Sequence, residues 1–317
     1  MKLYFYTNGG FGIGLGHIMR SLCLAQRLKN LGFKPAFISL NQNEFKEGHK
    51  LIKEAGFKLE LIDDLKEITK AHTLICDDCL LNARDLTQLK EHFKKLVFVD
   101  DENELNFYNV DALINPNPYG KKFPYKSPKT TKFFFNLSFL RDEFLKARKI
   151  KIKKKINNIF LTLGGSDDTN LTLKIIKELK GFLKKEKINL HIAVGRAFKH
   201  KKSLLKFKNK NVIFYKKAKM AFLMQKSDIG ICGCGQSVYE FWSLGLPLIS
   251  LVLAPNQQNL AEFAEKKDML IYARDYKVIK KELLKMTYQK RLSLQKNIKK
   301  NFSYQKGLKE FVKWLKI

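Results

Sequence analysis

Five glycines within ten positions precede a histidine in the stretch TNGGFGIGLGH, which spans residues 7–17. Glycine adopts positive φ angles and lets a ligand approach the backbone closely, and the free N–H groups of a following helical turn favour an anion. A plain strand-to-helix turn with a glycine cap is the alternative, but such turns rarely need so many glycines. The order GIGLGH also lacks the glycine spacing of a dinucleotide fingerprint. We therefore expect a loop that binds a phosphate-bearing ligand, with His17 at its edge.

Two further glycine turns lie in the second half of the chain. The stretch LTLGGSDDTN ends a strand-like run in two glycines, and Ser166 and Thr169 are placed to cap a following helix. In CGCGQSVYEFW, residues 236 and 237 open a helix that carries Glu240 on its first turns. At this place in a cleft, Glu240 would be able to accept hydrogen bonds from ribose hydroxyls while the backbone amides of residues 235–237 face a diphosphate. The alternative for Glu240 is a glutamate stabilised by the helix dipole.

The first glycine loop requires a strand before it and a helix after it. Residues 3–6 have the pattern of a strand, and apolar residues recur every three or four positions over residues 18–28, which predicts a helix packed by one face. Short β-branched or aromatic runs then alternate with amphipathic segments along the chain. This alternation indicates βαβ units with parallel sheets, so the predicted fold class is α/β.

A lysine-rich segment, residues 146–155, interrupts this alternation near the middle of the chain. A length of 317 residues suits two domains. We expect an N-terminal α/β domain over residues 1–150 and a C-terminal α/β domain over residues 151–317 that ends in a helical tail. Each would be doubly wound and Rossmann-like, and the two would face a cleft in which ligands bind at the carboxyl ends of the strands.

The composition is that of a globular protein of the cytoplasm. Hydrophobic residues make up 45% and charged residues 29% of the sequence, no run reaches the roughly 18 apolar residues of a membrane span, and no signal-peptide pattern opens the chain. The five cysteines are odd in number and lie in apolar segments, which favours reduced, buried thiols. The CDDC sequence of residues 76–79 has the spacing of a metal or redox pair, but no second pair with zinc spacing accompanies it. We expect no integral membrane segment and no metal.

A formal net charge of +31 is the electrostatic footprint that nucleic-acid binding requires. Only eight of the 61 basic residues are arginine, although arginine is favoured for bidentate contacts to phosphates and bases. The lysines are spread over most predicted helices and accompany no motif of a known nucleic-acid-binding module. We therefore expect a lysine-rich bias in composition and no nucleic-acid partner. The charge would still attract anionic membrane surfaces or nucleotide substrates.

An ordered set of segments resembles a known enzyme family. The segments, which together cover about residues 1–270, are IGLGHIMRSLCLAQRL, FVDDENE, DALINPNPYG, LSFLRDEF, LTLGGSDDTN and CGCGQSVYEFWSLGLPLISLVLAPNQQNLAEFAEKKDM. They are similar to the nucleotide-sugar hydrolase of pseudaminic acid biosynthesis. That family is itself similar to the lipid-linked N-acetylglucosaminyltransferase of peptidoglycan synthesis, and both have the two-domain GT-B fold. The lysine-rich remainder carries no matching motif, and the resemblance implies that it packs across the domains.

The resemblance implies hydrolysis of UDP-2,4-diacetamido-2,4,6-trideoxy-beta-L-altropyranose, in which water attacks the anomeric carbon and UDP and the free sugar are released. It implies that His17 is the general base, a role that suits an imidazole titrating near neutral pH. Amides would neutralise the diphosphate leaving group, so this mechanism requires no metal and no cofactor. We expect a cytoplasmic monomer whose partner is the UDP-sugar substrate, acting in flagellin or surface glycosylation.

The residues expected to bind the substrate or UDP lie in the three glycine loops, in the helix after the first loop, and in the NQ pair that would face the sugar and the phosphate. They are Gly14, Gly16, Arg20, Gly164, Gly165, Ser166, Gly235, Gln236, Ser237, Glu240, Asn256 and Gln257.

The chain departs from the family pattern in one segment. After the strand TLIC the family continues Asp-His-Tyr-Gly, and the tyrosine and its neighbours line the sugar site, whereas this chain has Asp77, Asp78 and Cys79. Three alternatives therefore stay open: hydrolysis of another diacetamido sugar nucleotide, sugar transfer by a glycosyltransferase of the same fold, and a non-catalytic accessory protein that binds sugar nucleotides. A requirement for an acceptor distinguishes the transferase, because a transferase would release little UDP from donor and water alone.

Overall fold

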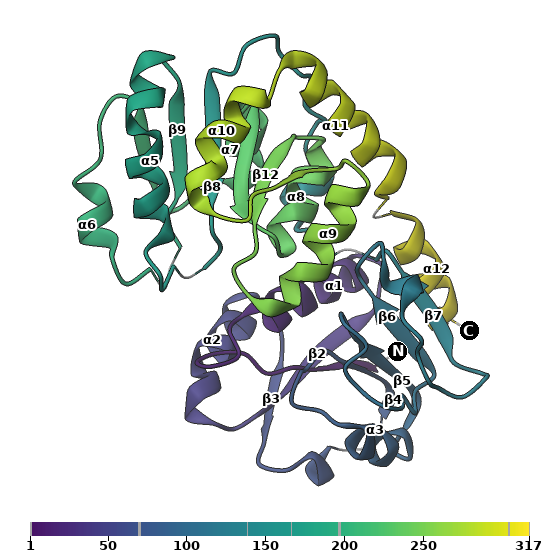
Figure 1. The fold of residues 1–317 in the computed structure, drawn as a ribbon. Coiled ribbons are helices and arrows are strands. Elements are labelled where there is room, and N and C mark those ends of the chain that lie inside the picture. Colours follow the sequence, from purple (N-terminus) through teal and green to yellow (C-terminus); the bar gives the residue numbers. More distant parts are fainter. Residues whose placement is uncertain are drawn as a thin grey trace. The chain divides into compact units, whose positions relative to one another are not determined.

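The computed structural model describes residues 2–68, 71–137, 139–165, 167–195, 198–303 and 305–316. These residues form two compact units, each built around its own sheet (Figure 1). Unit 1 consists of Met1–Leu140 and Ser303–Ile317, and unit 2 consists of Arg141–Phe302. None of the helices in the described ranges combines the length and the hydropathy of a membrane span.

Unit 1 contains a seven-stranded sheet in the order β3-β2-β1-β4-β5-β6-β7. The strands are β1 (Lys2–Tyr6), β2 (Lys34–Leu40), β3 (Leu59–Ile62), β4 (Ala71–Cys76), β5 (Phe93–Val99), β6 (Ala112–Asn115) and β7 (Lys132–Phe135). All pairings are parallel, and in the central register Tyr6 of β1 lies opposite Ile38 of β2 and Cys76 of β4. Parallel sheets are covered on both faces, which explains the apolar runs within these strands, such as residues 96–99 of β5.

Helices cover both faces of this sheet. They are α1 (Gly16–Asn30), α2 (Lys46–Glu54), α3 (Ala83–Lys90) and α12 (Gln305–Lys316), with the short 3-10 turns η1 (Asn43–Phe45), η2 (Leu65–Glu67) and η3 (Gly120–Lys122). Leu24 of α1 packs in one apolar cluster with Phe5 of β1, whereas Leu86 of α3 packs in another with Tyr6 of β1. The helix predicted over residues 18–28 is confirmed as α1, and it buries one face as expected.

Unit 2 contains a six-stranded parallel sheet in the order β10-β9-β8-β11-β12-β13. The strands are β8 (Asn158–Thr162), β9 (Asn189–Ala193), β10 (Val212–Tyr215), β11 (Ile229–Gly233), β12 (Leu248–Leu251) and β13 (Ile271–Tyr272). The helices are α4 (Asp142–Lys146), α5 (Leu171–Lys185), α6 (Lys201–Leu205), α7 (Met220–Lys226), α8 (Gln236–Leu244), α9 (Gln258–Lys266), α10 (Ile279–Lys285) and α11 (Tyr288–Asn301), with the 3-10 turns η4 (Pro255–Gln257) and η5 (Tyr276–Val278). A core cluster joins Ile175 and Leu179 of α5 to Leu161 of β8 and Leu283 of α10.

The strand order of both sheets is doubly wound. It reverses between β1 and β4 in unit 1 and between β8 and β11 in unit 2. Ligands of such sheets bind outside the carboxyl ends of the strands at this switch point. His17 comes after β1, whereas Gly164 and Gly235 come after β8 and β11. The predicted fold class is confirmed, and each switch point carries residues that we predicted to bind a ligand.

The two units divide at Leu140, before the expected boundary at residue 150, and the last part of the helical tail, Ser303–Ile317, belongs to unit 1 instead of the second domain, whereas α10 and α11 belong to unit 2. Contacts explain both differences. The Ile150 N–H donates to Leu244 O at 2.8 Å, which ties the segment before residue 150 to α8 of unit 2. In the tail, Phe311 of α12 packs edge-on against Phe134 of β7, with the ring centroids 5.2 Å apart, and α12 lies beside β7 in Figure 1.

Two local expectations were wrong. The N–H groups of Leu171 and Thr172 donate to the Asp167 carboxylate at 2.7 and 2.9 Å, so this carboxylate, with its two acceptor oxygens, satisfies the start of α5 in place of Thr169. Ser166, the other expected cap, lies outside the described residues. Cys79 is exposed and not buried, because it stands in the turn after β4 and not within the strand.

Helix α2 approaches the first glycine loop so closely that Gly48 has no room for a side chain. A Cβ atom at Gly48 would lie 2.3 Å from the carbonyl oxygen of Gly9. Alanine in place of glycine normally stabilises a helix interior by about 1 kcal/mol. Here the backbone would have to move, and overpacking costs about 1–3 kcal/mol. We expect Gly48→Ala to lower the free energy of unfolding, as measured by urea denaturation.

The matched control is Gly181→Ala in the exposed interior of α5, where a Cβ atom would meet nothing within 4 Å. This variant should raise the free energy of unfolding by about 1 kcal/mol. If Gly48→Ala stabilised the protein as Gly181→Ala does, the contact between α2 and the glycine loop would not be tight.

Candidate active site

His17, the second residue of α1, pairs with a buried carboxylate. Its Nδ1 lies 2.8 Å from Oδ1 of Asp77, whose side chain is 2% exposed. Asp77 follows β4 directly, and its N–H donates to Tyr6 O at 2.9 Å, so the backbone of Asp77 continues the pairing of β4 with β1. The switch point of the first sheet therefore brings an imidazole and a carboxylate together.

Arg20 binds the same carboxylate from the next position on that face of α1. Its Nε and Nη2 donate to the two Asp77 oxygens at 2.7 and 2.6 Å, a bidentate pair, and its Nη1 donates to Asp101. The Ser21 hydroxyl also donates to Asp77, at 3.1 Å. Asp77 thus binds side chains of three α1 residues, including His17. Arg20, predicted to contact the substrate, is engaged by two carboxylates.

The charges of this cluster favour a protonated imidazole. Burial lowers the pKa of His17, but the hydrogen bond to Asp77 and its negative charge raise it, and the result is a pKa of about 10. Burial raises the pKa of Asp77, whereas the charges of Arg20 and His17 lower it, and the result is a pKa of about 2. At neutral pH the pair is therefore an imidazolium and a carboxylate.

Asp78 and Cys79 occupy the positions at which the resembled family has histidine and tyrosine. Asp78 is buried and accepts hydrogen bonds from Asn8 Nδ2 at 2.6 Å and from the Leu80 N–H at 2.8 Å, and burial raises its pKa. Cys79 is exposed, and its thiol contributes to raising the pKa of the His17 imidazole. Asp78 therefore organises the turn after β4, and Cys79 stands beside the imidazole.

Three carboxylates of this cluster, Asp77, Asp78 and Asp101, were absent from the predicted site residues. A partial signal was present in the sequence. Asp77 directly follows the apolar run TLIC, and Asp101 lies two residues after the run LVFV. These runs became the neighbouring strands β4 and β5, and the carboxyl ends of parallel neighbours meet at one edge of the sheet.

The glycines of the first loop divide into a packed and an open group. A Cβ atom at Gly10 would lie 1.9 Å from Glu44 O, and Gly10 and Gly14 exchange two backbone hydrogen bonds of 2.8 and 2.9 Å. Gly12 and Gly14 have φ angles of 86° and 74°, which side chains rarely adopt. At Gly14 and Gly16, both predicted to bind substrate, a Cβ atom would meet nothing within 4 Å. The fold itself requires some of these glycines, whereas the backbone is open at Gly12, Gly14 and Gly16.

The second switch point carries the predicted residues Gly164 and Gly165. Gly164 has a φ of 91°. A Cβ atom on Gly195 would lie 2.3 Å from Gly165 O and 2.7 Å from Gly164 O. Glycine at position 195 therefore lets the loops after β8 and β9 touch through their backbones, whereas a Cβ atom on Gly164 or Gly165 would meet nothing within 4 Å.

The third glycine turn leads directly into α8. Gly235 is the N-cap residue of this helix, and Gln236 and Ser237 are its first residues, as predicted. Gln257 of η4 lies beside this turn, because its Nε2 is 3.4 Å from the position of a Cβ atom on Gly235. The neighbouring Asn256 is exposed. The structure thus brings one residue of the NQ pair next to the turn that we predicted to bind the diphosphate.

Glu240 lies on the second turn of α8 and is 6% exposed. Arg141 Nε donates to its Oε1 at 2.9 Å, and Arg141 Nη2 lies 2.8 Å from the same oxygen. Burial raises the pKa of Glu240 and Arg141 lowers it, and the result is a pKa of about 7. The predicted ribose acceptor is therefore held by an arginine that sequence reasoning did not include in the site.

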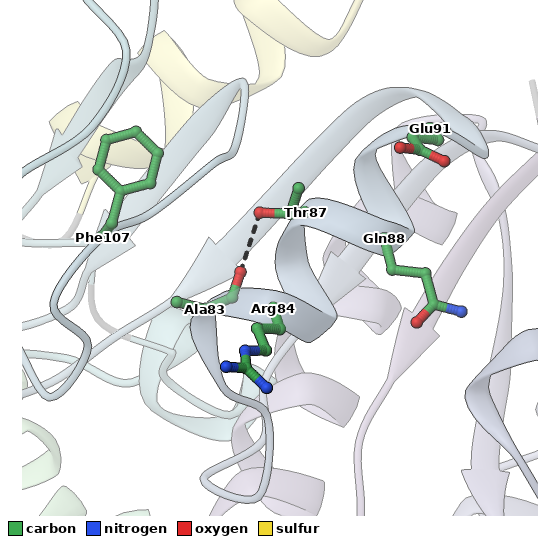
Figure 2. A pocket seen from close by; sticks show the side chains of 6 residues that line it. All are labelled: Ala83, Arg84, Thr87, Gln88, Glu91 and Phe107. Atoms are coloured by element: carbon green, nitrogen blue, oxygen red, sulfur yellow. Dashed lines mark hydrogen bonds between the residues drawn. The ribbon is translucent and has the colours of Figure 1, made fainter.

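A separate pocket of about 450 Å³ lies along α3 of unit 1 (Figure 2). It is lined by Ala83, Arg84, Thr87, Gln88, Glu91 and Phe107. None of the predicted site residues belongs to it. Within the described ranges, no three His, Cys, Asp or Glu residues are grouped so that they could hold a metal ion.

Comparison with known proteins connects these features to an enzyme family. Residues 159–314 match the model of the glycosyltransferase family 28 C-terminal domain. The chain is 30% identical over 277 residues to a Campylobacter jejuni protein named UDP-2,4-diacetamido-2,4,6-trideoxy-beta-L-altropyranose hydrolase, and the match covers 84% of this chain and 97% of that protein. It is 29% identical over 274 residues to an uncharacterised protein of Methanocaldococcus jannaschii, with 79% of this chain covered but only 55% of that longer protein.

The fold also has solved relatives. The crystal structure of Acinetobacter baumannii MurG superposes with a TM-score of 0.69 at 13% identity, and the match covers 99% of each chain. At this identity the similarity shows the fold alone, which is the GT-B fold with two Rossmann-like parallel sheets. Together with the match to the Campylobacter protein over nearly its full length, it confirms the resemblance found in the sequence: the chain belongs to the UDP-2,4-diacetamido-2,4,6-trideoxy-beta-L-altropyranose hydrolase family.

Proposed function

We propose that the protein is an enzyme that hydrolyses a UDP-linked 2,4-diacetamido-2,4,6-trideoxy sugar. Water attacks the anomeric carbon, the bond from that carbon to the diphosphate oxygen breaks, and UDP and the free sugar leave. The pair of His17 and Asp77 at the first switch point supports this proposal most directly, in a chain 30% identical to a protein named as such a hydrolase. The reaction would serve pseudaminic acid (nonulosonate) biosynthesis in the cytoplasm.

In this proposal unit 1 activates the water. In its neutral form, which predominates only above about pH 10, His17 accepts the proton of the attacking water on Nε2, while Asp77 binds Nδ1, orients the ring and stabilises the imidazolium that forms. Arg20 and Ser21 fix the carboxylate in turn, so the ring is positioned by several contacts instead of one. The open backbone at Gly14 and Gly16 would let the sugar diphosphate approach.

Unit 2 binds the nucleotide in this proposal. The N–H groups at the start of α8 would face the diphosphate and stabilise the leaving group as its charge develops. Glu240 would accept hydrogen bonds from the ribose hydroxyls. The other residues proposed to contact the sugar or phosphates in this unit are Gly164, Gly165, Asn256 and Gln257; Ser166, which lies outside the described residues, stays a sequence-based prediction.

Sugar transfer is the second candidate function. The match of residues 159–314 to the glycosyltransferase family 28 C-terminal domain and the fold shared with MurG favour it. Asp78 and Cys79 also change the site at the positions where the family has histidine and tyrosine. The two functions differ in what attacks the anomeric carbon: water for the hydrolase, an acceptor hydroxyl for the transferase.

A panel of UDP-linked 6-deoxy diacetamido sugars tests the reaction class. We expect one member to release UDP with water as the only acceptor, and the released UDP can be followed by a coupled assay and the sugar by mass spectrometry. Release that requires an added acceptor, with a glycoside as the product, would assign the transferase instead. Binding without release under either condition would leave the accessory-protein hypothesis.

Removal of the imidazole tests the role of His17. General-base catalysis contributes roughly 10²–10⁴-fold, so His17→Ala and His17→Asn should lower kcat by about that factor. UDP affinity should stay close to that of the wild type, because the proposed nucleotide contacts lie in unit 2. The measurement compares kcat, the calorimetric Kd for UDP and the Tm on the same preparations.

His200→Ala is the matched control, because His200 is exposed and lies in unit 2. It should leave all three quantities unchanged. A stable His17→Ala protein that binds UDP and turns over at nearly the wild-type rate would rule out the general-base role.

The pH dependence of turnover follows from the raised pKa of His17. A base acts only when it is deprotonated, so kcat should increase with pH and approach its plateau near pH 10, where His17 loses its proton. In Asp77→Asn the carboxylate charge is absent, so the pKa of His17 should fall toward its ordinary value of about 6.5. The plateau should then begin at lower pH, with a lower kcat because the imidazolium is less stabilised. A kcat that decreases with rising pH would instead indicate that the imidazolium itself acts, as a proton donor.

A further inference from the structure

The Arg141 guanidinium, which binds Glu240, is also fixed by contacts with other residues. Its guanidinium lies over the ring of Phe144, 5.0 Å from the ring centroid, and its Nη1 is 2.9 Å from Glu143 Oε1. Phe144 is buried, and Glu143 Oε2 accepts the Ala221 N–H at 3.1 Å. The segment at the start of unit 2 therefore fixes the guanidinium by a ring, a carboxylate and the start of α7.

Arg141 engages only one side of the Glu240 carboxylate. Its Nε and its Nη2 both contact Oε1. Oε2 accepts no hydrogen bond from any residue that the structure describes, yet it is not among the fully buried, unpaired polar atoms. Oε2 therefore keeps a small contact with solvent, and among the described residues it is the carboxylate oxygen that lacks a donor.

We propose that Arg141 is a positioning residue for the nucleotide: it holds Glu240 through Oε1 and presents Oε2 to the ribose hydroxyls. This inference rests on the proposed function, in which unit 2 binds UDP. Burial alone favours the neutral carboxylic acid. In that form one oxygen carries a proton and acts as a donor, so fewer acceptor sites remain for two hydroxyl donors. The fixed guanidinium offsets part of this burial and leaves the second oxygen for the ligand.

The charges around Glu240 indicate how removal of Arg141 would act. Among the described residues, the charged and titratable groups that face Glu240 are Arg141 and Glu143, from the segment that begins unit 2, and the Cys232 thiol from β11. Of these, only Arg141 lowers the pKa of Glu240, and Glu143 raises it. Without the guanidinium, Glu240 should stay protonated to a pH well above 7.

The test measures affinity for UDP and for 2′-deoxy-UDP by calorimetry between pH 6 and 9. The wild type should prefer UDP at pH 8 and lose this preference below about pH 7, as Glu240 takes up a proton. Arg141→Gln should bind UDP about ten-fold more weakly at pH 8, with little change for 2′-deoxy-UDP, and its preference should appear only at higher pH. Protonation of the phosphates is common to all variants and does not affect the comparison.

Arg148→Gln is the matched control, because Arg148 is an exposed arginine of the same segment. It should behave as the wild type. Arg141→Lys retains a cation next to Oε1. Compared with Arg141→Gln, it should return the pH midpoint of the preference for UDP toward the wild-type value, and the affinity for UDP should recover less. Glu240→Gln should bind UDP weakly, and its preference for UDP over 2′-deoxy-UDP should not change as the pH passes 7. Melting temperatures of all variants identify any loss of fold.

Two negative results have different meanings. A wild type that does not bind UDP would contradict the proposed function. A wild type that prefers UDP, together with a folded Arg141→Gln that keeps the same preference and the same pH midpoint, would overturn only the role of Arg141. If Arg141→Gln does not fold, Arg141→Lys decides the question. A pH midpoint equal to that of the wild type supports the inference. Equal affinity for UDP and 2′-deoxy-UDP at every pH overturns it.

Discussion

The buried carboxylate of Asp77 is the interaction on which the site of unit 1 depends. A carboxylate removed from water is stable only when its partners satisfy it, and here His17, Arg20 and Ser21, all from the first turns of α1, bind its two oxygens. Asp77 is fixed to β1 through its backbone N–H. One charge therefore joins the start of a helix to the centre of the sheet. The position of the imidazole, and with it any chemistry at His17, follows from this charge.

The glycine loop sets where that helix can begin. Gly10 and Gly14 close a turn through their backbones, and the segment around Glu44 and Gly48 packs so tightly against the loop that side chains there would collide. A turn fixed in this way places the first residues of α1 directly beyond β1. The same loop then leaves Gly16 uncovered. Rigidity on one side of the loop and open backbone on the other are both consequences of residues without a Cβ atom.

Sequence patterns were sufficient for the elements and for part of the site. Periodicity predicted α1, glycine turns predicted the loop and the start of α8, and alternation predicted the parallel sheets, because each of these is a local property of the chain. The partners of the charged groups were not predictable in this way. His17 and Asp77 are separated by 60 residues, and Arg141 and Glu240 by 99, so only the folded sheets bring them together. The expected domain boundary failed for the same reason, since residue 150 bonds to the distant α8.

The two buried carboxylates show how the number of partners decides the state of a charge. Asp77 binds two cationic side chains and a hydroxyl, which outweigh burial, so its pKa falls to about 2 and it stays ionised throughout the working range of pH. Glu240 has one cationic partner on one oxygen, burial prevails, and its pKa rises to about 7. The first is a permanent anion, suited to stabilise a proton on the imidazole beside it. The pKa of Glu240 lies so close to neutral pH that a hydrogen-bond donor to its second oxygen would decide whether the carboxylate is ionised. The protein supplies donors to one oxygen only. A ribose that donates two hydroxyls would supply the hydrogen bonds that the other oxygen lacks.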